Sequence, residues 1–125
     1  MARNAINSDK ITPKGFPFSA AVWAGDILYL SGQVGLDLAV GKVVDGGAAR
    51  ETEQILKNCR AVLAEAGKTF DDVIKANVYL VDMADFAAMN EVYAHHFKAP
   101  YPARTSVEVA SLPLGARVEI EMIAR

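Results

Sequence analysis

The number of predicted elements constrains the fold of this chain most, because the sequence contains only two helical segments but a larger number of strands. Apolar residues recur at intervals of three and four across 48–68 and again across 82–98, which predicts two amphipathic helices. The order along the chain is strand, strand, a short strand near 42–44, helix, strand, helix, strand, strand. Two helices cover only one face of such a sheet, so the other face must meet solvent or another subunit.

The alternation of residues within the strands predicts which side chains share a face. The run 18–35 reads as a hairpin that reverses at Gly25 and Asp26. In the later strand 71–82, the alternation predicts one face with Ile74, Ala76, Val78 and Leu80, opposite a face with Lys75, Asn77 and Tyr79. The last two strands, 104–112 and 116–124, are expected to pair as a hairpin around "SLPLG". That pairing would place Arg104, Ser106, Glu119 and Glu121 on one sheet face.

The order of the elements predicts an α+β fold, and length and composition indicate one domain over residues 1–125. The chain is 52% hydrophobic and has a net charge of -2, so no basic excess points to nucleic acid as a partner. Cys59 is the only cysteine, which excludes an intramolecular disulfide and a cysteine metal cluster and fits a reducing compartment. The N-terminal residues show no signal-peptide core, and no apolar run approaches the ~20 residues of a membrane span. We therefore expect a cytoplasmic protein with no membrane partner.

The chemistry-bearing residues point to a carboxylate-binding site rather than a metal or phosphate site. No GxSxG, GxxxxGK[ST], HExxH or GxGxxG motif occurs, and the adjacent His95 and His96 would point about 100° apart on a helix, a poor geometry for sharing a metal. The candidates are Arg104, Ser106 and Glu119, with Ser31. A guanidinium fork matches a carboxylate and a glutamate polarises water, which suits hydrolysis of a small acid. The alternative is that Arg104 merely pairs with Glu119 or Glu121, and alternation does not separate the two glutamates.

Three ordered blocks of sequence resemble a known family. They read "PFSAAVWAGDILYLSGQVGLD", "NCRAVLAEAGKTFDDVIKANVYLVDMADFAAMNEVY" and "PARTSVEVASLPLGARVEIEMIA". Together, from about Pro13 to the C-terminus, they are similar to the RidA (YjgF) family of reactive-intermediate deaminases. The resemblance implies a chorismate-mutase-like α+β fold with a six-stranded mixed sheet and two helices on one face. It also implies a homotrimer whose sheets form a central barrel, with clefts between subunits.

The resemblance also assigns roles to individual residues. Arg104 of the "PAR" element would grip the substrate carboxylate, and Glu119 of "VEIE" would position the attacking water. Ser31 of "SGQ" would line the cleft beside Gly32. At two substrate-binding positions the chain departs from the commoner pattern. Phe18 stands where many members have tyrosine, and Ser106 stands where many have cysteine.

The implied activity is that of a 2-iminobutanoate/2-iminopropanoate deaminase. Such an enzyme hydrolyses reactive enamine and imine intermediates to 2-keto acids and ammonia, and we expect no metal and no cofactor. Two alternatives stay open: a pathway-specific deaminase with a larger enamine substrate, and a non-catalytic trimer that binds small acids or acts as a chaperone. Family members have also been described as ribonucleases that inhibit translation, a function that the acidic charge balance disfavours here.

Overall fold

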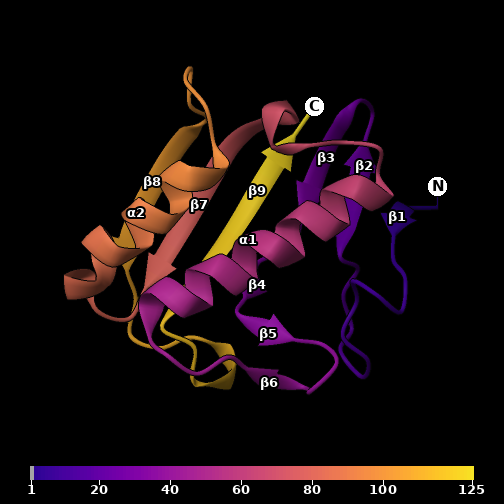
Figure 1. Cartoon of the computed structure of the whole chain (residues 1–125). Helices are drawn as coiled ribbons and strands as arrows, with labels where there is room; N and C mark the ends of the chain where they lie inside the picture. The colour runs from indigo at the N-terminus through magenta and orange to yellow at the C-terminus, as the bar shows by residue number, and fades with distance from the viewer. Residues whose placement is uncertain (1) are drawn as a thin grey trace.

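A computed structural model, which describes residues 2–125, shows a mixed β-sheet with two helices packed on one face (Figure 1). The main sheet has seven strands, one more than expected: six follow the order β1-β2-β3-β9-β7-β8, and the short β4 pairs with β9 beyond the end of β3. The predicted α+β class with two helices on one face is confirmed. The strands of this sheet are β1 (Asn4–Ile6), β2 (Ala21–Ala24), β3 (Ile27–Leu30), β4 (Gln33–Val34), β7 (Val73–Leu80), β8 (Ala103–Glu108) and β9 (Val118–Ala124).

The N-terminal hairpin and the short strand follow the sequence prediction. β2 and β3 pair antiparallel around Gly25, whose φ of 61° is readily adopted only by glycine in such a tight reversal. Leu28 and Leu30 of β3 are buried, whereas Tyr29 between them is exposed. The short strand β6 (Lys42–Val43) pairs with β5 (Leu36–Asp37) in a separate two-stranded sheet.

Helix α1 (Ala48–Glu65) contributes more buried residues to the core than the second helix does. Its apolar stripe is fully buried, and Cys59 lies within that stripe, where burial raises the pKa of its thiol to about 12. Just beyond the end of the helix, Gly67 has a φ of 73°, and its N–H and that of Lys68 donate to carbonyl groups of the last turn. Cys59 is therefore a core residue and an inert one.

Helix α2 (Phe86–His96) follows a short 3-10 turn, η2 (Met83–Asp85), and carries the chain from β7 to β8. Asp82 caps this turn by accepting a hydrogen bond from the N–H of Ala84. His96 contacts Arg60 and Glu53 at 3.1 Å each, and His95 is exposed. Within residues 2–125 no cluster of three or more His, Cys, Asp or Glu side chains could hold a metal ion.

The predicted hairpin between the last two strands is wrong. β8 pairs parallel with β7, while β9 pairs antiparallel with the other edge of β7, so β7 separates the two. The reason is that α2 is long enough to serve as the crossover that a parallel pair requires. The segment 109–117, with the turn η3 (Pro113–Gly115), then carries the chain past β7 to β9.

This topology also overturns the predicted sharing of one sheet face. Arg104 lies opposite Ala76 in the register of β7, on the face that the helices cover. Glu119 lies opposite Tyr79, on the uncovered face. Arg104 and Ser106 are therefore on the opposite face from Glu119 and Glu121.

A β-bulge in β7 corrects a second prediction. The register between β7 and β9 shifts between Val73 and Lys75, so Ile74 is turned outward and is 46% exposed instead of packing in the core. Beyond the bulge Ala76, Val78 and Leu80 are fully buried, as predicted. Because of the extra residue, simple alternation assigns the correct sheet face after the bulge and the wrong face before it.

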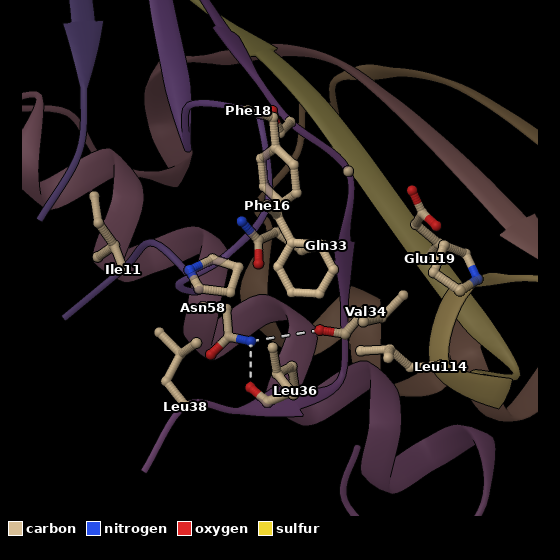
Figure 2. Close-up of a pocket in the computed structure, with 14 residues that line it drawn as sticks. Ile11, Phe16, Phe18, Gln33, Val34, Leu36, Leu38, Asn58, Leu114 and Glu119 are labelled. Carbon is tan, nitrogen blue, oxygen red and sulfur yellow. Dashed lines mark hydrogen bonds between the residues drawn. The ribbon is translucent and has the colours of Figure 1, made fainter. Parts of the chain in front are cut away.

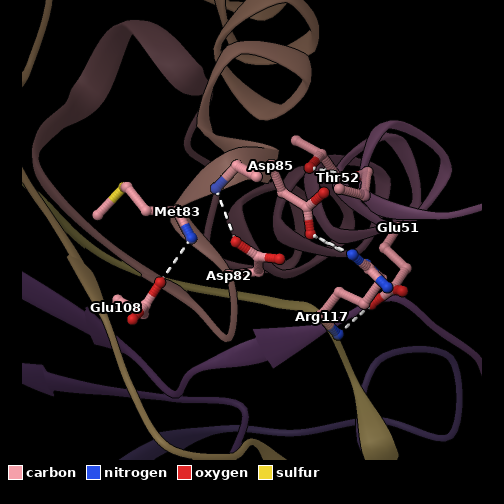
Figure 3. Close-up of polar contacts among 9 residues, drawn as sticks. Glu51, Thr52, Asp82, Met83, Asp85, Glu108 and Arg117 are labelled. Carbon is pink, nitrogen blue, oxygen red and sulfur yellow. Dashed lines mark hydrogen bonds and ion pairs between the residues drawn. The ribbon is translucent and has the colours of Figure 1, made fainter.

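Polar contacts tie the strand ends to the helices (Figure 3). The backbone N–H of Arg117 donates to the buried carboxylate of Glu51 at 2.8 Å, and the Arg117 guanidinium pairs with Asp85 at 2.9 Å. At the end of β8, Glu108 accepts a hydrogen bond from the N–H of Met83 at 2.7 Å. The two contacts of Arg117, which directly precedes β9, fix the start of this strand relative to α1 and to the turn before α2. No helix within residues 2–125 is both long and apolar enough to cross a membrane.

Candidate active site

A pocket of about 510 Å³ opens where β3 gives way to β4 (Figure 2). We call it the Glu119 pocket, because Glu119 is its one ionisable side chain. Four residues predicted from the sequence line it together: Phe18, Ser31, Gly32 and Glu119. Its remaining walls are mostly apolar and come from Ile11, Pro13, Phe16, Gln33, Val34, Leu36, Leu38, Asn58, Pro113 and Leu114.

A break in strand pairing creates this pocket. Tyr29 of β3 pairs with Ile123, but Gln33 of β4 pairs with Ile120, so one extra residue is accommodated between the two pairs. Ser31 lies in this break, where its N–H bonds to the Ala20 carbonyl and its hydroxyl donates to the Ser19 carbonyl at 2.6 Å. The break thus holds Ser31 toward β2 and leaves space at Gly32.

A side chain at position 32 would displace the Glu119 carboxyl group, which occupies the space of its Cβ atom. A Cβ atom placed on Gly32 would lie 2.1 Å from Glu119 Oε2, far inside van der Waals contact. The carboxyl group therefore lies directly against the backbone of the "SGQ" segment. This close approach gives a physical reason for a glycine that the sequence marked only by resemblance.

The structure separates the two glutamates of β9 that alternation leaves equivalent. Glu121 Oε1 accepts hydrogen bonds from Tyr79 Oη at 2.5 Å and from Asn77 Nδ2 at 3.2 Å. The bond to Glu121 is the main reason that the pKa of Tyr79 rises to about 12. Glu119 accepts no hydrogen bond from any residue in 2–125, and burial, followed by the charge of Glu121, raises its pKa. Glu121 is committed to a structural contact, and Glu119 is the carboxyl group free to exchange a proton.

Arg104 and Ser106 lie in a separate place, which we call the Arg104 region. The Arg104 guanidinium carbon is 4.7 Å from the ring centroid of Tyr93 and 5.7 Å from that of Phe86, both on α2. The Ser106 hydroxyl is buried without a hydrogen-bond partner in the described chain. A shallow cavity beside Arg104 is lined by Asn90, Glu91, Tyr93, Ala94 and Tyr101.

One chain therefore brings together four of the six predicted site residues and leaves two elsewhere. β7 lies between the strands that carry Glu119 and Arg104, and the two side chains are on opposite faces of the sheet. The Glu119 pocket offers a proton-exchanging carboxyl group, and the Arg104 region offers a guanidinium for an anion. Neither region alone provides both groups that hydrolysis of an imino acid would use.

Asn58 and Leu114 also line the pocket, although neither was among the predicted site residues. Asn58 donates to the carbonyl oxygens of Leu36 at 2.9 Å and Val34 at 3.4 Å, so it holds the β4–β5 connection in place (Figure 2). Leu114 has a φ of 60°, a conformation that a leucine rarely adopts, and is 58% exposed at the pocket wall. A polar residue beside an apolar stripe was the only available signal for Asn58. For Leu114 the only available signal was its place in the "PLG" turn.

Comparison with known proteins shows similarity over nearly the whole chain. The family model described as Endoribonuclease L-PSP matches residues 9–125. A human protein named 2-iminobutanoate/2-iminopropanoate deaminase is 42% identical over 124 residues, which cover 99% of this chain and 90% of the relative.

Solved structures agree with the sequence comparison. The crystal structure of RidA from the Antarctic bacterium Psychrobacter sp. PAMC 21119 has a TM-score of 0.92 and 41% identity, and the match covers 98% of each chain. The crystal structure of TdcF from E. coli with bound serine has a TM-score of 0.88 and 32% identity, covering 97% of each chain. The fold and most of the chain length are thus shared with these proteins.

Proposed function

Because this chain belongs to the RidA family, whose family model is described as Endoribonuclease L-PSP, we propose that it is a 2-iminobutanoate/2-iminopropanoate deaminase. The observation that carries this proposal is the Glu119 carboxyl group, which lies unpaired in an apolar pocket against Gly32. A carboxyl group with a raised pKa both accepts and returns a proton, which hydrolysis of an imine requires. The human relative that bears this name is similar over almost its whole length.

The proposed reaction uses only side chains of this protein and water. Arg104 binds the carboxylate of the 2-imino acid and orients its imine carbon. Glu119 takes one proton from the attacking water and passes it to the imine nitrogen, which leaves hydroxyl and amino groups on the same carbon. Glu119 then transfers the hydroxyl proton to that nitrogen, the carbon–nitrogen bond breaks, and ammonia and the 2-keto acid are released.

We further propose that the cleft forms between copies of the chain in a homotrimer with a central barrel. Within one chain Arg104 and Glu119 are on opposite sheet faces, so a complete site needs the Arg104 region of one copy against the Glu119 pocket of the next. The uncovered face carries large exposed apolar side chains, including Tyr29 and Val107, which suits burial against another subunit. A monomeric mass by light scattering at micromolar concentration would remove this part of the proposal.

The test of function is the rate of keto-acid formation from 2-aminoacrylate generated in situ by a serine dehydratase. We expect wild type to accelerate the reaction and Arg104→Ala to lose most of this acceleration, because removal of the guanidinium leaves the carboxylate unanchored. A Lys98→Ala variant, which removes an exposed cation outside both regions, serves as the control and should behave as wild type. If wild type does not exceed buffer, deamination of these small imines is rejected.

The size of the pocket favours a second candidate substrate. A volume of about 510 Å³ is typical of sites for much larger ligands than a three- or four-carbon imino acid. Phe18 contributes a ring without a hydroxyl, and Phe16, Leu36 and Leu38 extend the apolar wall. A larger enamine acid would fill this space. A substrate panel of increasing side-chain size, with kcat/KM as the readout, separates the two: a maximum at four carbons or fewer would reject the larger substrate.

A further inference from the structure

Arg104 differs from three other arginines in the absence of a polar side-chain partner within residues 2–125. The guanidinium groups of Arg60, Arg117 and Arg125 each contact a side chain, namely His96, Asp85 and Asp26. Arg104 forms no hydrogen bond or ion pair with any residue in 2–125. Its donors are uncommitted, although the residue is partly buried.

Two aromatic rings replace the missing polar partners. Tyr93 and Phe86 lie two helical turns apart on one side of α2, and the guanidinium carbon is 4.7 Å and 5.7 Å from their ring centroids. A ring face attracts a guanidinium through its quadrupole without using any N–H group. The contact therefore restricts the guanidinium and leaves its fork available for a carboxylate.

The ring of Tyr93 is itself fixed by further aromatic contacts. It stacks on Phe97 with a centroid distance of 4.4 Å and an interplanar angle of 22°. Phe97 in turn contacts Phe70 at 4.9 Å. Tyr93 is only 5% exposed, and its hydroxyl is buried without a partner in the described chain. The position of Tyr93 thus depends on its ring and on these stacking contacts rather than on a hydrogen bond.

We propose that Tyr93, supported by Phe86, is a positioning residue that holds the Arg104 guanidinium with its N–H groups free to bind a carboxylate. The helical period of α2 indicated only that Phe86 and Tyr93 are core residues. That the bound carboxylate belongs to an imino acid rests on the proposed function. The positioning of Arg104 by Tyr93 is independent of the proposed function.

Two substitutions at Tyr93 test the role of the ring. Tyr93→Leu removes the ring face, so we expect KM for an imino acid to rise about fivefold, with kcat changed much less. Tyr93→Phe keeps the ring and removes only the unpartnered hydroxyl, so its KM should stay within about twofold of wild type. Trp23→Leu is the control, since it removes a ring that packs against the core from β2, and three strands lie between β2 and β8. An unchanged KM in Tyr93→Leu, or an equal loss in Tyr93→Phe, would overturn the proposal.

Two further measurements separate positioning from general damage to the fold. In an Arg104→Ala background, Tyr93→Leu should cause no additional loss of kcat/KM, because the group that it positions is gone. The NMR order parameter of the Arg104 Nε–H bond should fall in Tyr93→Leu and not in Tyr93→Phe. An unchanged order parameter rejects the positioning role whatever the activity. A reduced one, in a protein that deaminates nothing, rejects only the proposed function.

Discussion

The Arg104 region and the Glu119 pocket position their ionisable groups by different kinds of contact. Arg104 rests against two rings of α2, which restrict a cation without consuming its donors. Glu119 is placed by a break in strand pairing and by the missing side chain of Gly32, in surroundings that disfavour its charged form. The first arrangement suits a group that stays charged and binds. The second suits a group that gains and loses a proton.

Glu119→Gln should have the largest effect on this comparison. The amide keeps the size of the side chain but cannot accept a proton, so kcat/KM is expected to fall about 10²–10⁴-fold. Glu121→Gln is the matched control, because Glu121 is already engaged by Tyr79 and Asn77. Steady-state kinetics on the same imine measure both. Equal losses in the two variants would mean that the glutamates are not distinguished as the structure suggests.

Gly32→Ala should have the next largest effect. Its methyl group would overlap Glu119 Oε2, so the carboxyl group must move, and a displacement of about 1 Å costs roughly 100-fold in activity. Gly25→Ala serves as the control. It introduces backbone strain at a φ of 61° but meets no atom within 4 Å, so thermal stability should fall without loss of kcat. Retained activity in Gly32→Ala would show that the close approach has no role.

The smallest expected effect concerns stability as a function of pH. The pKa of Glu119 is raised in the folded protein, so the stability linked to its protonated form is present at acidic pH and lost as pH rises through the raised value. Glu119→Gln removes the loss of stability that accompanies ionisation of Glu119, so the variant should be more stable than wild type at pH 7. The gain should be no more than about 1 kcal/mol, because the half-exposed group is screened by solvent. Denaturant unfolding at pH 4 and pH 7 measures the difference. A variant that is less stable than wild type at pH 7 would contradict this assignment.

Local signals in the sequence predicted the elements but not how the last strands pair. The Gly25 reversal and the apolar stripe of α1 depend on neighbouring residues, and the structure confirms both. The pairing of β8 with β7 depends instead on how α2 packs across the sheet. A short turn such as "SLPLG" suggested a hairpin, and nothing local opposed that interpretation.

The candidate site was predictable only in part for a related reason. The alternation pattern assigned Arg104 and Glu119 to one face because it assumed that the last two strands pair with each other. It also missed the bulge that exposes Ile74. It also could not separate Glu119 from Glu121, since both have the same period and charge. The difference between them comes from Tyr79, on a strand about 40 residues away in sequence. The resemblance named the residues, and the assignment of their roles remains a prediction.

A mixed-subunit experiment tests the central claim most directly. Arg104→Ala and Glu119→Gln chains are unfolded together, refolded as an equal mixture, and assayed for imine deamination beside each variant refolded alone. If each cleft takes Arg104 from one copy and Glu119 from the next, the mixture should recover about one quarter of wild-type activity, the share of clefts with both residues intact. Activity no higher than that of the separate variants would contradict a cleft built from two copies of the chain.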